Sequence, residues 1–327
     1  MITFVTLNPA IDEIYYLNKF NAKTRNRIDY LNKVEYFDGY RDPLVVHAGG
    51  KGVGSAICLQ KNGIDTCLLS IIGGYNGQLF EDKLRENKVT TSFVYSAVET
   101  RRNTSIFDNK ENSLTELIVP GMLIKREDVN HFVKHYESLL SKTSFMVLCG
   151  SIPVGVDASI YHDLIEKAHQ ANIQVLLYTS GQAFEMALKA GPKYVIPELD
   201  YITNYYGKSI NSQEAVLELG NKIISANKNI EIVVLPAMFD KEIYFIERDY
   251  TYKVSFKEIE HCHVLGMYDQ LIASFTESLK KQESREDMYK NIASSIIVNL
   301  NSIRKLIFNK DKLDEKIDSI QLEEVGT

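Results

Sequence analysis

The sequence is short of positive charge and has no long apolar run. Its 327 residues include 37 Lys and Arg against 43 Asp and Glu, a formal net charge of −6. Non-specific binding to nucleic acid or to an anionic membrane needs a basic field, so we expect no nucleic-acid partner and no membrane partner. A local basic pocket for a phosphate is still compatible with this balance. No apolar stretch approaches the length of a membrane span.

Cysteine is also scarce, and its placement argues against disulfide or metal frameworks. The four cysteines are scattered and form no Cys-x-x-Cys pair: Cys58, Cys67, Cys149 and Cys262. This usage is typical of reduced, mostly buried thiols in a cytoplasmic protein. The triplet His-Cys-His at 261–263 has metal-ligand residue types, but no second cluster completes a tetrahedral site, so we predict ordinary structure there.

What the sequence does contain is a regular alternation of short β-branched runs and helical patterns. The start, MITFVTLNPAIDEIYY, has no basic region and predicts a strand, not a signal peptide. The expected strands are nearly continuously apolar, as in a parallel sheet covered on both faces: 2-ITFVTL-7, 67-CLLSII-72, 145-FMVLC-149, 174-QVLLY-178 and 231-EIVVL-235. Helical spacing in 53–63 and 159–172 completes the pattern. We therefore predict an α/β fold with a mainly parallel sheet.

Two segments, at about 11–47 and 93–119, interrupt this alternation. They contain shorter alternating runs that resemble antiparallel strands outside the main sheet. We interpret both as a small lid inserted into a single domain that spans residues 1–327. An exposed lid sheet can pair with a second lid, which makes a homodimer plausible.

Glycine-rich turns carry the strongest functional signal. In 48-AGGKGVGSA-56, three glycines flank Lys51 immediately before a predicted helix, where free N–H groups and the lysine favour an anion. The spacing is not that of a nucleotide P-loop, and a plain turn with a solvated lysine is an equal alternative. Two more glycine clusters, 73-GGYNG-77 and 150-GSIPVG-155, also follow strands. Three such turns at one sheet edge favour a ligand site.

Together these features resemble the PfkB (ribokinase-like) carbohydrate kinase family, and within it the branch of 1-phosphofructokinases and tagatose-6-phosphate kinases. The motifs occur in the family's order and cover nearly the whole chain: 6-TLNPAID-12, 48-AGGKG-52, 73-GGYNG-77, 100-TRRN-103, 115-TELIVPG-121, 150-GSIPVGV-156 and 179-TSG-181. The first two motifs together are specific to the family, and the others are weaker signals. The resemblance implies a doubly wound α/β domain, flanked by helices, with a β-stranded lid over the sugar.

The resemblance also implies an activity and a set of site residues. The expected reaction is ATP- and Mg²⁺-dependent phosphorylation of a hydroxyl of fructose 1-phosphate, fructose 6-phosphate or tagatose 6-phosphate. Substrate would meet Asp12, Gly49, Gly50, Lys51, Arg101 and Asn103, with Lys51 near its phosphate. The stretch 266-GMYD-269 falls where the family carries Gly-Ala-Gly-Asp. Asp269 would then be the catalytic base, and the turn of Gly266, Met267 and Tyr268 an anion hole; a plain helix cap is the alternative role for Asp269.

Departures from the family gather on the nucleotide side. Tyr178 replaces an aspartate and Tyr268 a glycine, which would be strained if that position needs a positive φ. The remaining positions expected near the nucleotide are Ser180, Glu198, Leu235 and Ala237, and Glu198 or Asp200 could help to hold a metal. On the sugar side, Gly54 stands where asparagine is usual. Two interpretations remain: a divergent kinase, which we favour because Asp269 is retained, or a sugar-phosphate-binding regulatory protein with a degenerate nucleotide site.

Overall fold

A computed structural model describes most of the chain: residues 1–36, 39–198, 202, 207, 209–237, 241–255, 265–302, 315–317 and 320–325. Ten strands of this part form one central sheet in the order β16-β15-β14-β13-β12-β11-β10-β1-β6-β7. Their bounds are β1 (Ile2–Thr6), β6 (Thr66–Gly73), β7 (Thr90–Ser96), β10 (Phe145–Cys149), β11 (Val175–Tyr178), β12 (Tyr194–Val195), β13 (Ile232–Ala237), β14 (Glu242–Ile246), β15 (Thr251–Ser255) and β16 (Glu323–Val325).

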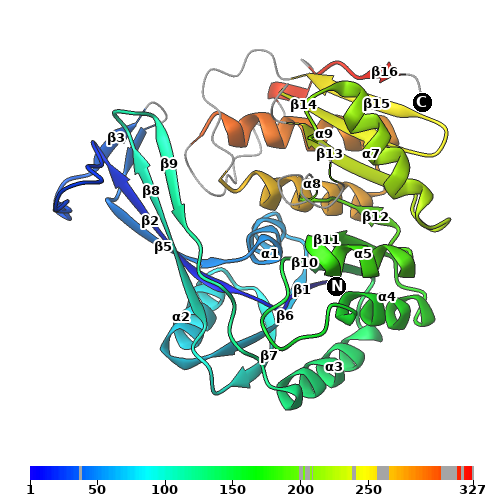
Figure 1. Cartoon of the computed structure of the whole chain (residues 1–327), viewed down its shortest axis with the longest axis horizontal. Coiled ribbons are helices and arrows are strands. Elements are labelled where there is room, and N and C mark those ends of the chain that lie inside the picture. The colour runs from blue at the N-terminus through cyan, green and yellow to red at the C-terminus, as the bar shows by residue number, and fades with distance from the viewer. Residues whose placement is uncertain are drawn as a thin grey trace.

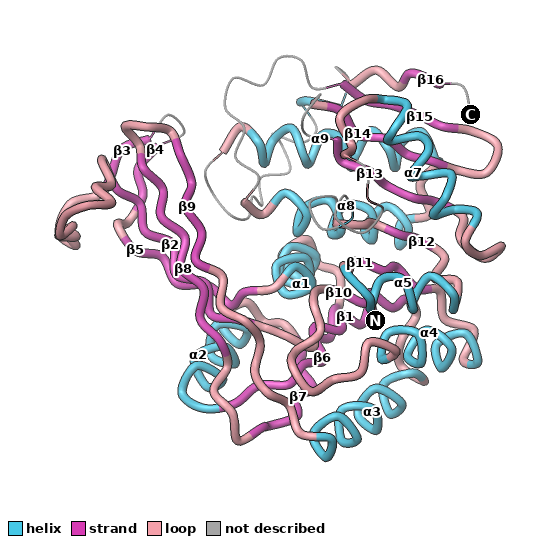
Figure 2. Tube along the Cα trace, in the orientation of Figure 1, coloured by secondary structure: helices cyan, strands magenta, loops and turns pink. Residues whose placement is uncertain are grey.

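The sheet is parallel from β7 to β13 and antiparallel from β13 to β16. Each predicted strand overlaps one of its parallel strands, so the expected α/β fold with a mainly parallel sheet is confirmed (Figure 2). Strands β13, β14 and β15 are antiparallel because short hairpins join them, and parallel neighbours need a longer crossover connection. Strand β16 comes after α8 and α9 in the chain and adds to the edge antiparallel to β15.

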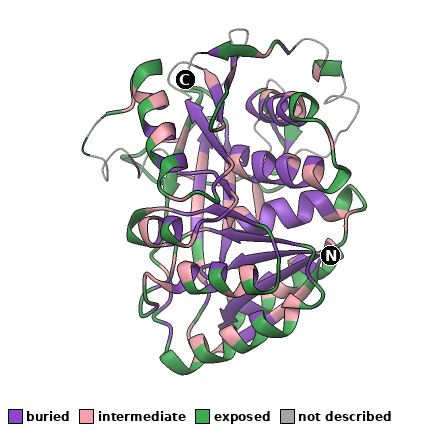
Figure 3. Cartoon of the chain, turned by 90° about the vertical axis from the view of Figure 1, so that its right-hand side faces the viewer, coloured by how far each residue is buried: buried purple, intermediate pink, exposed green. Residues whose placement is uncertain are grey.

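Helices cover both faces of the sheet, as in a doubly wound fold. One face packs against α1 (Lys51–Lys61), α2 (Gly74–Glu86), α8 (Met267–Lys281) and α9 (Arg285–Leu300), and the other against α3 (Arg126–Leu140), α4 (Ile160–Gln170), α5 (Gly181–Ala190) and α7 (Gln213–Ser225). Alternate residues of one strand serve the two cores: Val147 faces the first and Leu148 the second. Figure 3 shows the buried strands between helices that expose only their outer surfaces. None of the described helices is long and apolar enough to cross a membrane.

The lid is a four-stranded sheet that projects from the body (Figure 1). Its order is β5-β2-β8-β9, with β2 (Ala10–Leu17), β5 (Leu44–Gly49), β8 (Arg101–Asp108) and β9 (Ser113–Leu117), and a hairpin of β3 (Val34–Tyr36) and β4 (Gly39–Arg41) packs on it. Within each lid segment the strands pair antiparallel, as expected, but β2 and β8 join the two segments in parallel. They run parallel because both leave the carboxyl ends of parallel strands of the central sheet, β1 and β7. Residues 93–96 lie in β7, so the second lid segment starts later than the sequence suggested.

The fold makes a prediction about stability at α8, whose apolar stripe anchors the candidate site. Leu271 is fully buried in the first core, so Leu271→Ala should lower the free energy of unfolding by about 2–5 kcal/mol. Leu31→Ala, at a position that is 94% exposed, is the matched control and should change it by less than about 0.5 kcal/mol. Urea unfolding followed by circular dichroism measures both; equal losses would contradict the assigned core.

Candidate active site

A cavity of about 390 Å³ lies between the lid and the carboxyl ends of β1, β10 and β11. It brings together eight of the predicted site residues: Asp12, Gly50, Lys51, Arg101, Asn103, Ser180, Glu198 and Asp269. Loops beyond the carboxyl ends of parallel strands are where open α/β sheets bind ligands. Substrate-side and nucleotide-side positions that are far apart in the sequence therefore line one cavity.

Asp12 is held in place on the lid side of this cavity. It lies opposite Asn103 in the β2–β8 pair, and Asn103 Nδ2 donates a 2.9 Å hydrogen bond to Asp12 Oδ1. Gly49 gives the carboxylate room, because a Cβ at that position would lie 2.4 Å from Asp12 Cγ. Glycine is therefore required at position 49 by the Asp12 carboxylate as well as by the turn.

Arg101, which is expected to meet the substrate, is partly engaged by the backbone of the protein itself. Its guanidinium donates to three backbone carbonyls, those of Asn8 at 2.9 Å, Pro9 at 3.4 Å and Val119 at 2.9 Å. Burial lowers the pKa of Arg101, and the nearby Asp12 carboxylate opposes that shift. Part of its hydrogen-bonding capacity therefore ties the chain after β9 to the β1–β2 turn, while its charge stays beside Asp12 in the cavity.

Helix α1 begins at Lys51, two residues before the segment 53–63 that the sequence predicts to be helical. Gly50, with φ of 121°, precedes it in a conformation that side chains rarely adopt. Gly52 allows a close approach to β1, since a Cβ there would lie 2.5 Å from Thr6 Oγ1. Lys51 therefore stands at a helix N-terminus, where both the N–H groups and the ammonium favour an anion.

Helix α8 presents a second N-terminus to the same cavity. Gly266, with φ of 79°, is the N-cap, and the first i→i−4 bond runs from Gln270 N to Gly266 O. The first-turn N–H groups belong to Met267, Tyr268 and Asp269, so they are the donors that an anion would meet. Tyr268 lies within the helix and has no positive φ, so the left-handed residue is Gly266 and no strain arises at the substituted position.

Asp269 is 1% exposed and lies against α1. A Cβ at Gly54 would lie 1.9 Å from Asp269 Oδ1, so the glycine at this position is what lets the carboxylate occupy its place. Ser55 Oγ is 2.9 Å from Asp269 O and 2.7 Å from Lys51 O, bridging the first turns of the two helices. Sequence reasoning missed Ser55, which lies inside a quoted motif but carries no signature of its own.

The cysteines beside this contact are inert thiols. Burial first, and then the Asp269 carboxylate, raise the pKa of Cys58 and Cys149. Cys67 is buried too, and burial raises its pKa to about 11. The expectation of buried, reduced thiols therefore fits these three, while Cys262 and the triplet 261–263 lie outside the described residues.

The nucleotide-side positions separate into two groups. Ser180 occupies the N-cap position of α5 without a capping side-chain hydrogen bond, and it lines the cavity with Glu198 and Tyr178. Burial, followed by Glu198 and Tyr268, raises the pKa of the Tyr178 hydroxyl, so it remains a neutral phenol. Leu235 and Ala237 have fully buried side chains in β13, which leaves only their backbone to meet a ligand. Asp200 lies outside the described residues.

Two carboxylates in the cavity, Glu198 and Asp269, supply oxygen donors of the kind that Mg²⁺ prefers. Within the described part of the chain, no group of three or more His, Cys, Asp or Glu could hold a metal ion. A magnesium ion held mainly by phosphate oxygens and water needs only one or two protein carboxylates, so these residues fit it.

Several cavity residues were absent from the predicted set. Asn8, Ser105, Glu116 and Ser151 line the cavity, and Asn8 Nδ2 donates to Ser151 Oγ at 3.0 Å. Glu116 adds a lid carboxylate near Ser105, whose Oγ is 3.4 Å from Glu116 Oε1. All but Ser105 fall inside motifs quoted above. Ser105 reaches the cavity because it pairs with Glu116 in the β8–β9 ladder, and the sequence alone does not reveal that pairing.

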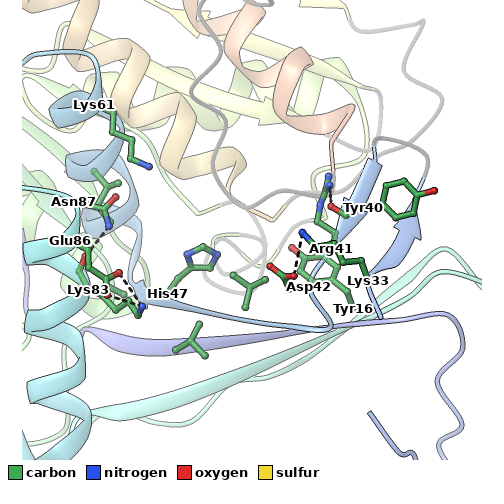
Figure 4. Close-up of a pocket in the computed structure, with 14 residues that line it drawn as sticks. Tyr16, Lys33, Tyr40, Arg41, Asp42, His47, Lys61, Lys83, Glu86 and Asn87 are labelled. Carbon is green, nitrogen blue, oxygen red and sulfur yellow. Dashed lines mark hydrogen bonds and ion pairs between the residues drawn. The ribbon is translucent and has the colours of Figure 1, made fainter. Parts of the chain in front are cut away.

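A second cavity, of about 500 Å³, lies between β5, the β3–β4 hairpin and the ends of α1 and α2 (Figure 4). It shares no lining residue with the first. His47, which borders the glycine-lysine turn, lines this second cavity. Charged side chains that line the second cavity form ion pairs with one another, with Lys33 3.6 Å from Asp42 and Lys83 3.0 Å from Glu86. The larger hollow is therefore not where the predicted site residues gather.

Comparison with known proteins places this arrangement in a family. The sequence pattern of the pfkB family carbohydrate kinases matches residues 6–294 of this chain. The chain belongs to the pfkB family. This confirms the family predicted from the motifs, and the protein is a phosphotransferase of the kind that acts on carbohydrates.

Relatives within the pfkB family cover nearly the full chain. Tagatose-6-phosphate kinase of Staphylococcus epidermidis is 25% identical over 327 residues, which cover 99% of this chain and 100% of that protein. The 1-phosphofructokinase of Bacillus subtilis is 27% identical over 290 residues, or 89% of each chain. A crystal structure of a Thermotoga maritima protein described as a possible 1-phosphofructokinase superposes with a TM-score of 0.88, 26% identity and 99% coverage of both chains.

The contact between Gly54 and Asp269 yields a prediction. Gly54→Ala would force the carboxylate away, so we expect kinase activity to fall about 100-fold and the free energy of unfolding to fall by about 1–3 kcal/mol. Gly77→Ala is the matched control, another helical glycine without positive φ whose added Cβ meets nothing closer than 3.3 Å. Coupled-assay kinetics and urea unfolding measure both; an active, fully stable Gly54→Ala protein would show that Asp269 has room to move.

Proposed function

We propose that this pfkB kinase transfers the terminal phosphoryl group of ATP to a hydroxyl of a ketohexose phosphate: fructose 1-phosphate, fructose 6-phosphate or tagatose 6-phosphate. The observation that carries the proposal is that Asp12, Lys51 and Asp269 line one cavity, with Asp269 at a helix N-terminus. The names of two relatives, tagatose-6-phosphate kinase and 1-phosphofructokinase, support the substrate class.

Each side chain has a role in this reaction. Asp12, oriented by Asn103, accepts hydrogen bonds from sugar hydroxyls. The ammonium of Lys51 attracts the phosphate of the acceptor, and the charge of Arg101 balances Asp12 across the cavity. Asp269 accepts the proton of the attacking hydroxyl, which makes the oxygen a better nucleophile.

The first turn of α8 stabilises the charge that moves during transfer. Phosphoryl transfer depends mainly on positioning and on electrostatic stabilisation, because the transferred group has little covalent chemistry for the protein to perform. The N–H groups of Met267, Tyr268 and Asp269 supply fixed dipoles at the place where the nucleophile is activated. With Tyr268 inside the helix, these three donors do not depend on a second glycine.

Fewer residues are assigned to the side of the cavity that would bind ATP, the phosphoryl donor. Glu198 and Ser180 line the cavity beyond Tyr178, and we propose that ATP approaches there, with the backbone of Leu235 and Ala237 at its border. When bound, Mg²⁺ neutralises charge on the phosphate oxygens, and Glu198 is the residue that would hold it.

We also propose that the lid mediates a homodimer. Strand β9 is one of the two edge strands of the lid sheet within the described residues. Its last residue, Leu117, and the following Ile118 and Val119 are exposed. Exposed edges and apolar side chains invite pairing with a second copy.

The proposed role of Asp269 can be tested by one substitution. Asp269→Asn removes the proton acceptor, so we expect kcat to fall by about 10²- to 10⁴-fold while sugar-phosphate binding is retained. Asp163→Asn removes another carboxylate from the first turn of a helix, α4, and should leave kcat unchanged. ADP release from ATP–Mg²⁺ with each of the three sugar phosphates, together with calorimetric binding, provides the measurements.

The outcomes separate the two interpretations. Loss of turnover in Asp269→Asn alone supports the kinase. If the unmodified protein binds a sugar phosphate tightly but releases no ADP with any of them, the protein is a sugar-phosphate-binding regulator and the kinase proposal fails. Equal losses in Asp269→Asn and Asp163→Asn would reduce Asp269 to a helix-dipole residue.

A further inference from the structure

Two positions that depart from the pfkB pattern, Tyr178 and Tyr268, are in direct contact. Their ring centroids lie 5.1 Å apart with an interplanar angle of 52°. Tyr178 is fully buried at the end of β11, and Tyr268 is half-buried in the first turn of α8. The substitutions are therefore two halves of one packed unit, not independent losses.

This aromatic pair has a charge at each end. The ammonium of Lys51 lies 5.7 Å from the centroid of the Tyr268 ring. At the other end, Glu198 lines the cavity beside Tyr178, and its charge, after burial, raises the pKa of the Tyr178 hydroxyl. The row Lys51–Tyr268–Tyr178–Glu198 thus crosses the cavity from the acceptor side to the donor side.

The contact matters because lysine is a flexible ligand. Its four-carbon stem leaves the ammonium many positions, and freezing them costs conformational entropy when a phosphate binds. A cation over an aromatic face is attracted by the ring quadrupole at separations up to about 6 Å. Tyr268 cannot turn away freely, since Tyr178 packs against it. A glycine at position 268 would offer no such surface.

We propose that Tyr268 is the positioning residue that holds Lys51 toward the phosphate of the acceptor, with Tyr178 as its support, so that this pair sets the affinity for phosphorylated sugars. The inference deepens the proposed function and rests on its choice of acceptor class. Tyr268 acts through Lys51, because its ring, and not its hydroxyl, carries the contact.

The test compares two substitutions that differ only in whether the ring remains. Tyr268→Leu should weaken the binding of fructose 1-phosphate, fructose 6-phosphate or tagatose 6-phosphate by about 2- to 30-fold, the range of a cation–π contact. Tyr268→Phe should bind as the unmodified protein does. Isothermal titration calorimetry without ATP gives these affinities, and thermal unfolding checks that both variants fold.

A double-mutant cycle with Lys51→Met ties the effect to the lysine. In the Lys51→Met background, Tyr268→Leu should cause no further loss of affinity. Equal additional losses in both backgrounds, or a Tyr268→Phe variant as weak as Tyr268→Leu, would overturn the inference.

A readout that needs no ligand keeps this inference separate from the proposed function. After reductive ¹³C-methylation, the Lys51 signal in an NMR spectrum should carry a ring-current shift that Tyr268→Phe retains and Tyr268→Leu removes, with Lys51→Met assigning the peak. Absence of that shift in the unmodified protein overturns the positioning role. Absence of ADP release with the shift present overturns only the kinase reaction.

Discussion

The active site depends on one close approach, that of helices α1 and α8 at their N-terminal turns. Gly54 removes the side chain that would otherwise occupy the position of the Asp269 carboxylate, and Ser55 bridges the backbones of Lys51 and Asp269. Both dipoles therefore point positive ends at the same cavity. Moving either helix outward would separate Lys51 from the proposed base Asp269 and from the α8 amides at once, so the packing of the helices and the proposed chemistry are constrained by the same contact.

This constraint changes the meaning of the substituted positions. Read singly along the sequence, Gly54, Tyr178 and Tyr268 suggest erosion of a site. In space, Gly54 makes room for Asp269, and the two tyrosines pack on each other between Lys51 and Glu198. A buried ring contact forms only if both partners are present, so a pair like this is better explained by a remodelled site than by unrelated losses.

Sequence patterns reveal the parts of the molecule that local physics determines. Apolar runs fix the parallel strands, and glycine turns followed by periodic helices locate the starts of α1 and α8. What they cannot reveal depends on distant partners. The donors of Arg101 go partly to the carbonyls of Asn8 and Val119, and the φ of Tyr268 is ordinary because the helix starts one residue after Gly266. Neither fact has a signature at the residue itself.

The lid illustrates how such distant partners couple binding to structure. Val119 is held twice, since its carbonyl accepts from Arg101 and its N–H donates to Asn103 Oδ1. Asn103 in turn donates to Asp12, so the residue proposed to meet the sugar and the segment that leaves β9 share one hydrogen-bonded unit. A sugar bound to Asp12 as proposed would therefore contact the base of the lid through this unit. Because β2 and β8 pair along their whole length from that base, the position of Asp12 is tied to the lid sheet beside the cavity.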